Sequence, residues 1–94
     1  MTETPEYPKE LVGQKPRLKI TLDSHAQKRA RERGVSEDEI NDTLASYDTE
    51  LPGDFGRKNR HKVIGEHRIR VTFHVEPDDN HYVWTVTKDE VVVK

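Results

Sequence analysis

The chain has 94 residues, of which 31% are hydrophobic and 36% are charged. A chain of this length predicts one domain with a thin core of two layers, which buries roughly 60–65% of the unfolded surface. The sequence contains no cysteine, which excludes disulfides, thiolate metal sites and cysteine catalysis. No apolar run reaches the roughly 20 residues of a membrane span. We expect no secretion signal, because residues 1–17 show no positively charged start followed by an apolar stretch. We therefore expect a cytoplasmic protein with no membrane partner.

The net charge of −2 conceals a strong segregation of charge along the chain. Residues 25–35 carry four basic side chains against one acidic one, and residues 55–74 carry six against one. Between them, residues 36–54 carry seven acidic side chains and no basic one. The two basic segments can join in the fold into a surface for a polyanion such as RNA. A solvated surface with interleaved ion pairs is the alternative interpretation.

The N-terminal part of the chain predicts a loose tail followed by a strand. Residues 1–17 contain three prolines, mixed charges and few aliphatic side chains, which are typical of a flexible tail or arm. From residue 18 to residue 22 apolar and polar side chains alternate, which predicts a short strand with one apolar face. We expect residues 18–94 to form a single domain.

Two short helices follow this strand. Asp23 or Ser24 can cap a helix over residues 25–33, and Gly34 can end it. Residues 36–48 then begin with a capping box, S-E-D-E, and with acidic residues that suit the positive end of the helix dipole. The apolar face of this second helix consists of Ile40, Leu44 and Tyr47.

After a loop over residues 51–56, the hydrophobic pattern changes to that of strands. The expected strands are residues 62–64, 68–75 and 82–87, with a last edge strand at 91–93. Turns are expected at residues 65–66 and 77–80. This order predicts an α+β fold: a strand, a helix pair, and then a three- to four-stranded antiparallel sheet with the helices packed on one face. The apolar face expected under the helices is Ile69, Val71, Phe73 and Val75.

Basic side chains share two of the predicted surfaces. If the apolar residues of strand 68–75 pack under the helices, the alternate residues point the other way. These are Arg68, Arg70, Thr72 and His74. On the first helix, residues spaced four apart share one side. These are His25, Arg29 and Arg33. The two rows can converge at one edge of the sheet, or the histidines can bind backbone groups and the arginines nearby carboxylates.

No metal or cofactor site is expected. The sequence has five histidines but no H-x₃-H or H-E-x-x-H pattern. Gly53 and Gly56 are isolated, so no glycine-rich loop is present to hold a phosphate. We expect no bound metal and no cofactor.

The run over residues 23–40, D-S-H-A-Q-K-R-A-R-E-R-G-V-S-E-D-E-I, resembles the H-A-x-x-R-x-x-x-R-G-[IV]-[ST]-x-x-[ED]-[IV] opening of a family of small domains allied to the BrnT and RelE toxins. A later G-x-x-R-I-R-V segment at 65–71 and a closing strand at 82–87 match the same family in outline. The resemblance implies a RelE-like microbial ribonuclease fold. It also implies a toxin-type, metal-independent endoribonuclease that is neutralised by a cognate antitoxin.

Carried over position by position, the resemblance implies a catalytic set of His25, Arg70 and Thr85. RNA supplies its own nucleophile, the 2′-hydroxyl, so cleavage needs a proton acceptor or donor and positive groups on the phosphate. We expect His25 to move the proton, Arg70 to clamp the phosphate with two guanidinium hydrogen bonds, and Thr85 to donate a hydrogen bond. The expected RNA-binding residues are Arg29, Arg33, Arg57, Lys58, Arg60, Lys62, Arg68 and His74.

The expected partners are RNA, including mRNA on the ribosome, a cognate antitoxin, and a second copy of the chain in a homodimer. Tyr82 or Trp84 can stack on a base if its face is open, although core packing is the more common fate of a tryptophan. The alternative from another class is a non-catalytic RNA- or protein-binding module with the same fold.

Overall fold

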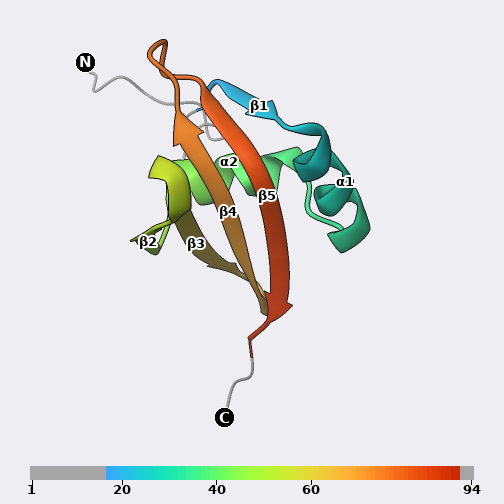
Figure 1. Ribbon diagram of the computed structural model, residues 1–94. Coiled ribbons are helices and arrows are strands. Elements are labelled where there is room, and N and C mark those ends of the chain that lie inside the picture. The colour runs from blue at the N-terminus through green and yellow to red at the C-terminus, as the bar shows by residue number, and fades with distance from the viewer. Residues whose placement is uncertain (1–16, 92–94) are drawn as a thin grey trace, which may run out of the picture.

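A five-stranded mixed sheet forms one layer of the structure, and two helices form the other (Figure 1). The computed structural model describes residues 17–91. The predicted tail therefore lies outside the described residues except for Arg17, and the predicted edge strand lies outside them except for Val91, which is not in a strand. In chain order the elements are β1 (Ile20–Leu22), α1 (Ser24–Arg33), α2 (Glu37–Ala45), β2 (Thr49–Pro52), the 3₁₀ turn η2 (Asp54–Gly56), β3 (Lys58–Ile64), β4 (His67–Val75) and β5 (His81–Glu90).

Side-chain caps at both helix starts confirm the predicted helix pair. The Asp23 carboxylate accepts a 3.0 Å hydrogen bond from the backbone N–H of His25. Gly34 ends α1 with a φ of 71°, a left-handed conformation that glycine adopts without strain. The capping box of Ser36 and Glu39 is complete, with hydrogen bonds of 2.9 and 3.1 Å. The second helix is shorter than predicted, however, because α2 ends at Ala45 and leaves Tyr47 42% exposed.

The sheet is larger than the predicted three to four antiparallel strands. Its strand order is β1-β5-β4-β3-β2, and β1 pairs in parallel with β5. The helix pair carries the chain from β1 at one edge of the sheet to β2 at the other edge. Strands β3, β4 and β5 then return across the sheet, so the last strand becomes the neighbour of the first. The predicted loop also contains an edge strand, because β2 pairs with β3 as far as Pro52. An edge strand tolerates proline since one side of it needs no backbone donor.

The hydrophobic core lies between the sheet and the helices. Ile69, Val71 and Phe73 of β4 are completely buried, which confirms the predicted face, whereas Val75 at the strand end is 46% exposed. Helix α1 packs on β5, and α2 packs on β4 and β3. The small buried side chains of α1, Ala26 and Ala30, allow that helix to approach the sheet closely.

A β-bulge in β5 changes the predicted alternation of that strand. Phe73 pairs with Val83 and Thr72 pairs with Thr85, so Trp84 is an extra residue in β5. As a result Val83 and Val86 are both buried although they lie three residues apart. Strict alternation predicts Val86 on the same face as Tyr82 and Trp84, and for Val86 this is wrong.

Within residues 17–91, no helix is both long enough and apolar enough to cross a membrane.

Candidate nucleic-acid interface on the open sheet face

The helices cover one face of the sheet and leave the other face open. In Figure 1, α2 lies behind β4 and β5, and α1 lies beside the β5 edge. Strand register places the side chains that alternate with the core on this second face, which we call the open face. Its members from the three central strands are Asn59, His61, Val63, Arg68, Arg70, Thr72, His74, Tyr82, Trp84, Thr85, Thr87 and Asp89, the last of which pairs with Arg68.

Three rings form an aromatic cluster at one end of the open face. Ring centroids of His74 and Tyr82 lie 5.6 Å apart, those of Tyr82 and Trp84 lie 4.8 Å apart, and those of His74 and Trp84 lie 5.7 Å apart. The indole Nε1 of Trp84 also donates a 2.8 Å hydrogen bond to Nδ1 of His74. Alternation along β5 places Trp84 on the same face as Tyr82, and the bulge then turns Thr85 to that face as well.

Arg57 extends the aromatic cluster toward the β2–β3 connection. Its guanidinium carbon lies 4.0 Å from the ring centroid of Trp84 and 5.8 Å from that of Phe55. The first distance is typical of a cation–π contact. The positive charge of Arg57 therefore lies next to the Trp84 ring of the aromatic cluster.

At the other end of the open face, a histidine lies among arginines. His61 pairs with Arg70 across β3 and β4, and the next open-face pair is Val63 with Arg68. Burial of the imidazole lowers the pKa of His61 below its ordinary 6.5, and the positive charges of Arg70 and Arg68 lower it further. His61 is therefore neutral at pH 7, beside two groups that suit a phosphate.

Short polar side chains separate the aromatic cluster from His61 and its arginines. Thr72 on β4 donates a hydrogen bond to Oδ1 of Asn59 on β3. Thr85 pairs with Thr72 from the other side. Thr85 thus lies on the open face, where its predicted role requires it. It is on β5, whereas His61 is on β3, at the other side of β4.

The predicted catalytic histidine, His25, lies near the aromatic end of the sheet. It is exposed at the start of α1, where it shares Asp23 with Tyr82, whose hydroxyl donates a 2.7 Å hydrogen bond to that carboxylate. This bond is the main reason why the pKa of Asp23 is lowered and that of Tyr82 is raised. Tyr82 pairs with His74, and Arg70 lies four residues further along β4. At about 3.3 Å per residue this is roughly 13 Å, so the fold does not bring His25 and Arg70 together.

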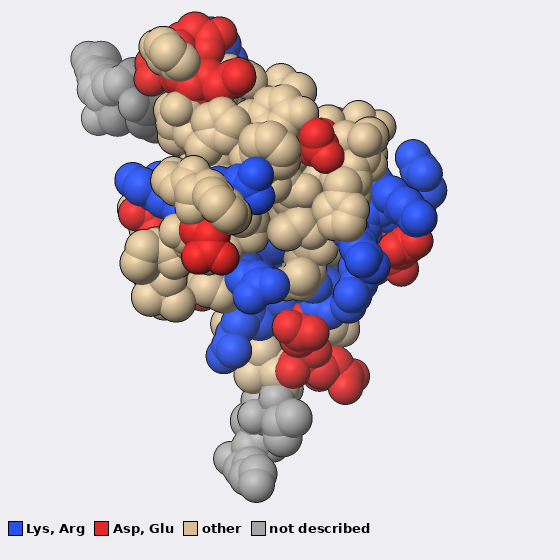
Figure 2. All heavy atoms as spheres, viewed as in Figure 1, with Lys and Arg blue, Asp and Glu red and all other residues tan. Residues whose placement is uncertain are grey.

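The other basic residues of α1 lie at the side of the sheet. Arg33 is exposed, and Arg29 is half-buried with its guanidinium 3.4 Å from the Glu32 carboxylate. Figure 2 shows basic side chains in a band that runs from the α1 side of the molecule across the lower half of the viewed face. Arg29 and Arg33 belong to α1 and not to the three central strands of the open face.

Half of the second basic segment is on the wrong face for this interface. Lys58, Arg60 and Lys62 pair with Phe73, Val71 and Ile69, so they lie on the helix-covered side. Arg60 donates 2.7 and 2.6 Å hydrogen bonds to the carboxylate of Glu50 and the carbonyl of Leu44. Lys62 donates to the carbonyl of Ser46. Arg60 and Lys62 thereby neutralise the negative C-terminal end of α2, and none of the three cations shares a surface with Arg68 and Arg70.

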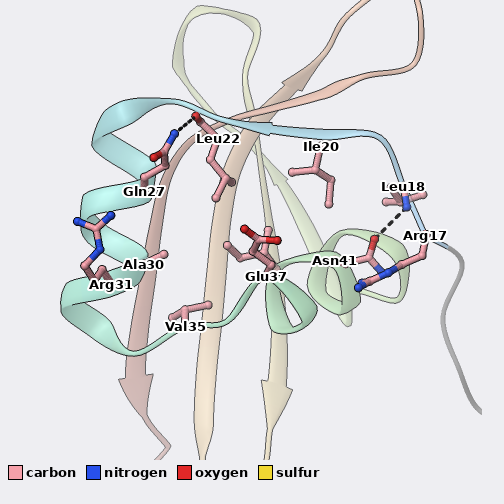
Figure 3. Close-up of a pocket in the computed structure, with 11 residues that line it drawn as sticks. Arg17, Leu18, Ile20, Leu22, Gln27, Ala30, Arg31, Val35, Glu37 and Asn41 are labelled. Atoms are coloured by element: carbon pink, nitrogen blue, oxygen red, sulfur yellow. Dashed lines mark hydrogen bonds between the residues drawn. The ribbon is translucent and has the colours of Figure 1, made fainter.

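A pocket of about 670 Å³ lies between β1 and the two helices (Figure 3). Its amides bind the backbone: Asn41 Oδ1 accepts from the N–H of Leu18 at 2.9 Å, and Gln27 Nε2 donates to the carbonyl of Leu22 at 3.0 Å. The first contact joins the segment before β1 to α2 and the second joins β1 to α1, so both serve the fold. The pocket is lined by none of the open-face residues.

In the described part of the chain, no three histidine or acidic side chains gather closely enough to hold a metal ion. Comparisons with protein-family models, with curated proteins and with solved structures give no match for this chain. The toxin relationship and the RelE-like fold therefore stay predictions from the helix motif.

Sequence reasoning missed two residues that the structure places at this interface. His61 was considered only as a metal ligand, and Phe55 only as part of a loop. A signal for His61 is nevertheless present. A two-residue turn at 65–66 pairs residue 64 with residue 67, and counting back along the hairpin pairs His61 with Arg70.

Proposed function

We propose that this protein is a metal-independent endoribonuclease that binds single-stranded RNA along the open face of its sheet. The observation that carries the proposal is the position of His61 beside Arg70 and Arg68, on the same face as the aromatic cluster. Arginines, a neutral imidazole and aromatic rings on one surface match the three parts of a single-stranded RNA: its phosphates, its 2′-hydroxyl and its unpaired bases.

The chemistry assigns one role to each group. Arg70 holds two oxygens of the scissile phosphate and stabilises the additional charge of the phosphorane. His61 accepts the proton of the 2′-hydroxyl while the 2′-oxygen bonds to phosphorus. The bond from phosphorus to the 5′-oxygen breaks, and that oxygen takes a proton from solvent. The products are a 2′,3′-cyclic phosphate and a free 5′-hydroxyl.

The arginines beside His61 make it a poor proton acceptor until RNA is bound. Their positive charge lowers the pKa of His61 in the free protein. A bound phosphate offsets that charge, so the imidazole becomes more basic when the substrate is in place. Binding of the phosphate and activation of the base are thus coupled through Arg70.

This assignment moves the base from His25 to His61 and keeps Arg70. The reason is distance, since His25 lies near Tyr82 and Asp23 at the other end of the sheet. Arg57 stays as an RNA contact, and Thr85, which the resemblance assigns to the catalytic set, becomes an RNA contact on the open face. The toxin-type role and a neutralising antitoxin are part of the proposal through the helix motif.

Cleavage of RNA by purified protein in EDTA tests the proposal. We expect 2′,3′-cyclic phosphate ends, a rate reduced by a factor of about 10²–10⁴ in His61→Asn, and a lower rate for bound substrate in Arg70→Ala. His25→Asn separates the two assignments, because it keeps activity if His61 is the base and loses it if His25 is. Salt-dependent RNA binding without cleavage by the wild type would favour the non-catalytic binding module.

A further inference from the structure

We infer that the β2–β3 turn presents Phe55 as a stacking platform for one unpaired nucleobase of the bound RNA, with the adjoining phosphate on Arg57. This inference rests on the proposed RNA-binding function and adds a base subsite to it. Three observations support it: the backbone conformation of Phe55, its exposure, and the position of its ring beside Arg57.

The backbone at Phe55 adopts a conformation that phenylalanine rarely takes. Its φ of 59° and ψ of 37° are left-handed, and Gly56 follows with a φ of 75°. The N–H of Arg57 donates a 3.0 Å hydrogen bond to the carbonyl of Asp54, as in a type I′ turn. The first central position of such a turn favours Asn, Asp or Gly, because a larger side chain is strained there.

The ring of Phe55 gains little from the fold in return. The residue is 90% exposed, the highest exposure among the large hydrophobic residues that the structure describes. An aromatic ring in water forgoes the stabilisation that burial gives. A strained backbone and an exposed ring at one position both oppose stability, which indicates a role in binding another molecule.

The surroundings of the ring favour RNA as that molecule. Arg57 lies between the ring of Phe55, at 5.8 Å, and that of Trp84, at 4.0 Å, so a positive charge flanks the platform. Each nucleotide offers a flat base for the ring and an anionic phosphate for the guanidinium. Arg57 also connects the platform to the open face through its contact with Trp84. Arg70 and His61 lie further along that face, on β4 and β3.

The platform has no groups that read one base rather than another. Every base presents a π-face, so stacking on a phenylalanine tolerates all four bases. The subsite therefore takes an unpaired base of any sequence, and it rejects a double helix because stacked bases cannot reach the ring.

The test measures binding of a short 2′-O-methyl oligonucleotide, which lacks the 2′-hydroxyl nucleophile and stays intact during titration. We compare wild type with Phe55→Ala, with Phe55→Trp, and with Val75→Ala as a control that shortens another exposed apolar residue, which is 46% exposed and alternates with the core side of β4 rather than with the open face. We expect Phe55→Ala to weaken binding roughly 5- to 150-fold. Phe55→Trp and Val75→Ala should bind as the wild type does.

A second series replaces single nucleotides of the oligonucleotide by abasic ones. One position should weaken binding to the wild type and leave binding to Phe55→Ala unchanged, because that variant has already lost the stack. If wild type and Phe55→Ala bind every oligonucleotide equally, the base subsite is wrong and the proposed RNA-binding function stands. If the wild type binds no oligonucleotide, the proposed function itself is contradicted.

Discussion

The indole Nε1 of Trp84 donates a 2.8 Å hydrogen bond to the imidazole Nδ1 of His74, across the β4–β5 ladder. A ring nitrogen that accepts a hydrogen bond carries no proton, so the neutral His74 ring has its proton on Nε2. That N–H is then a donor on the open face. Trp84 reaches His74 because it shares the open face with Tyr82, which pairs with His74.

We predict that ¹⁵N spectra of the imidazole will show the neutral His74 ring in the Nε2–H tautomer, with Nδ1 unprotonated. Trp84→Phe keeps a ring in the cluster and removes the donor, so the two tautomers should then mix. The measurement is a long-range ¹H–¹⁵N spectrum of wild type and variant, with His74→Asn to assign the His74 signals. An Nδ1–H tautomer in the wild type would contradict the bond.

We predict that both the cleavage rate and the free energy of unfolding decrease at acidic pH because His61 becomes protonated. Its pKa is below 6.5 in the folded state and near 6.5 in the unfolded chain. As the pH falls below 6.5, the unfolded chain therefore binds a proton at this residue before the folded protein does. The free energy of unfolding decreases with falling pH until the folded pKa has been passed. Cleavage at low substrate, kcat/KM, should be level above pH 6.5 and fall below it. Urea unfolding and kinetics in His61→Asn check both, and a decrease that persists in this variant would rule out His61.

We predict opposite phenotypes for two arginines of the second basic segment. Arg60→Met loses bonds to Leu44 and Glu50, so the free energy of unfolding should fall by about 1–3 kcal/mol. The pKa of Glu50, which Arg60 lowers, should rise toward its ordinary 4.5. RNA affinity should not change. In Arg70→Ala stability should hold, and the salt dependence of RNA binding should weaken by about 0.7 in log–log slope.

Denaturant titrations measure the free energy of unfolding of Arg60→Met and Arg70→Ala. Filter binding over a salt series measures the salt dependence of their RNA affinity. A wild-type salt slope in Arg70→Ala, or a reduced slope in a folded Arg60→Met, would show that the faces are assigned the wrong way.

We predict that Phe55→Asn stabilises the fold while it weakens RNA binding. Asparagine tolerates the left-handed conformation better than phenylalanine, and little apolar burial is lost at a residue that is 90% exposed. The free energy of unfolding should rise by about 0.5–1 kcal/mol. Thermal and urea unfolding measure it, and a loss of stability would mean that Phe55 serves the fold.

The local parts of the fold were predictable because their signals are local. Asp23, Gly34 and Ser36 fix the helix boundaries through bonds within a few residues of each cap. The bulge at Trp84 was not predictable, because it depends on pairing with β4 across the sheet. The parallel contact between β1 and β5 joins the two ends of the domain, and no pattern within either strand shows it.

The candidate site follows the same division. Arg68, Arg70 and His74 were assigned to the open face from the alternation of one strand, and they lie there. The basic segment at 57–62 was taken as one group, although alternation divides it: Arg60 faces α2 whereas His61 faces away. The distance from His25 to the arginines needed the strand order, which the sequence does not contain.

The most direct test of the open face as the RNA site is amide chemical-shift mapping with an uncleavable 2′-O-methyl oligonucleotide. We predict that the shifted amides will lie at Phe55 to Asn59, at Arg68 to His74 and at Tyr82 to Thr87, with little change in α2. The largest changes should include Arg57 and Arg70. Shifts confined to α2 and the pocket beside β1, or no shifts at any residue, would contradict the account.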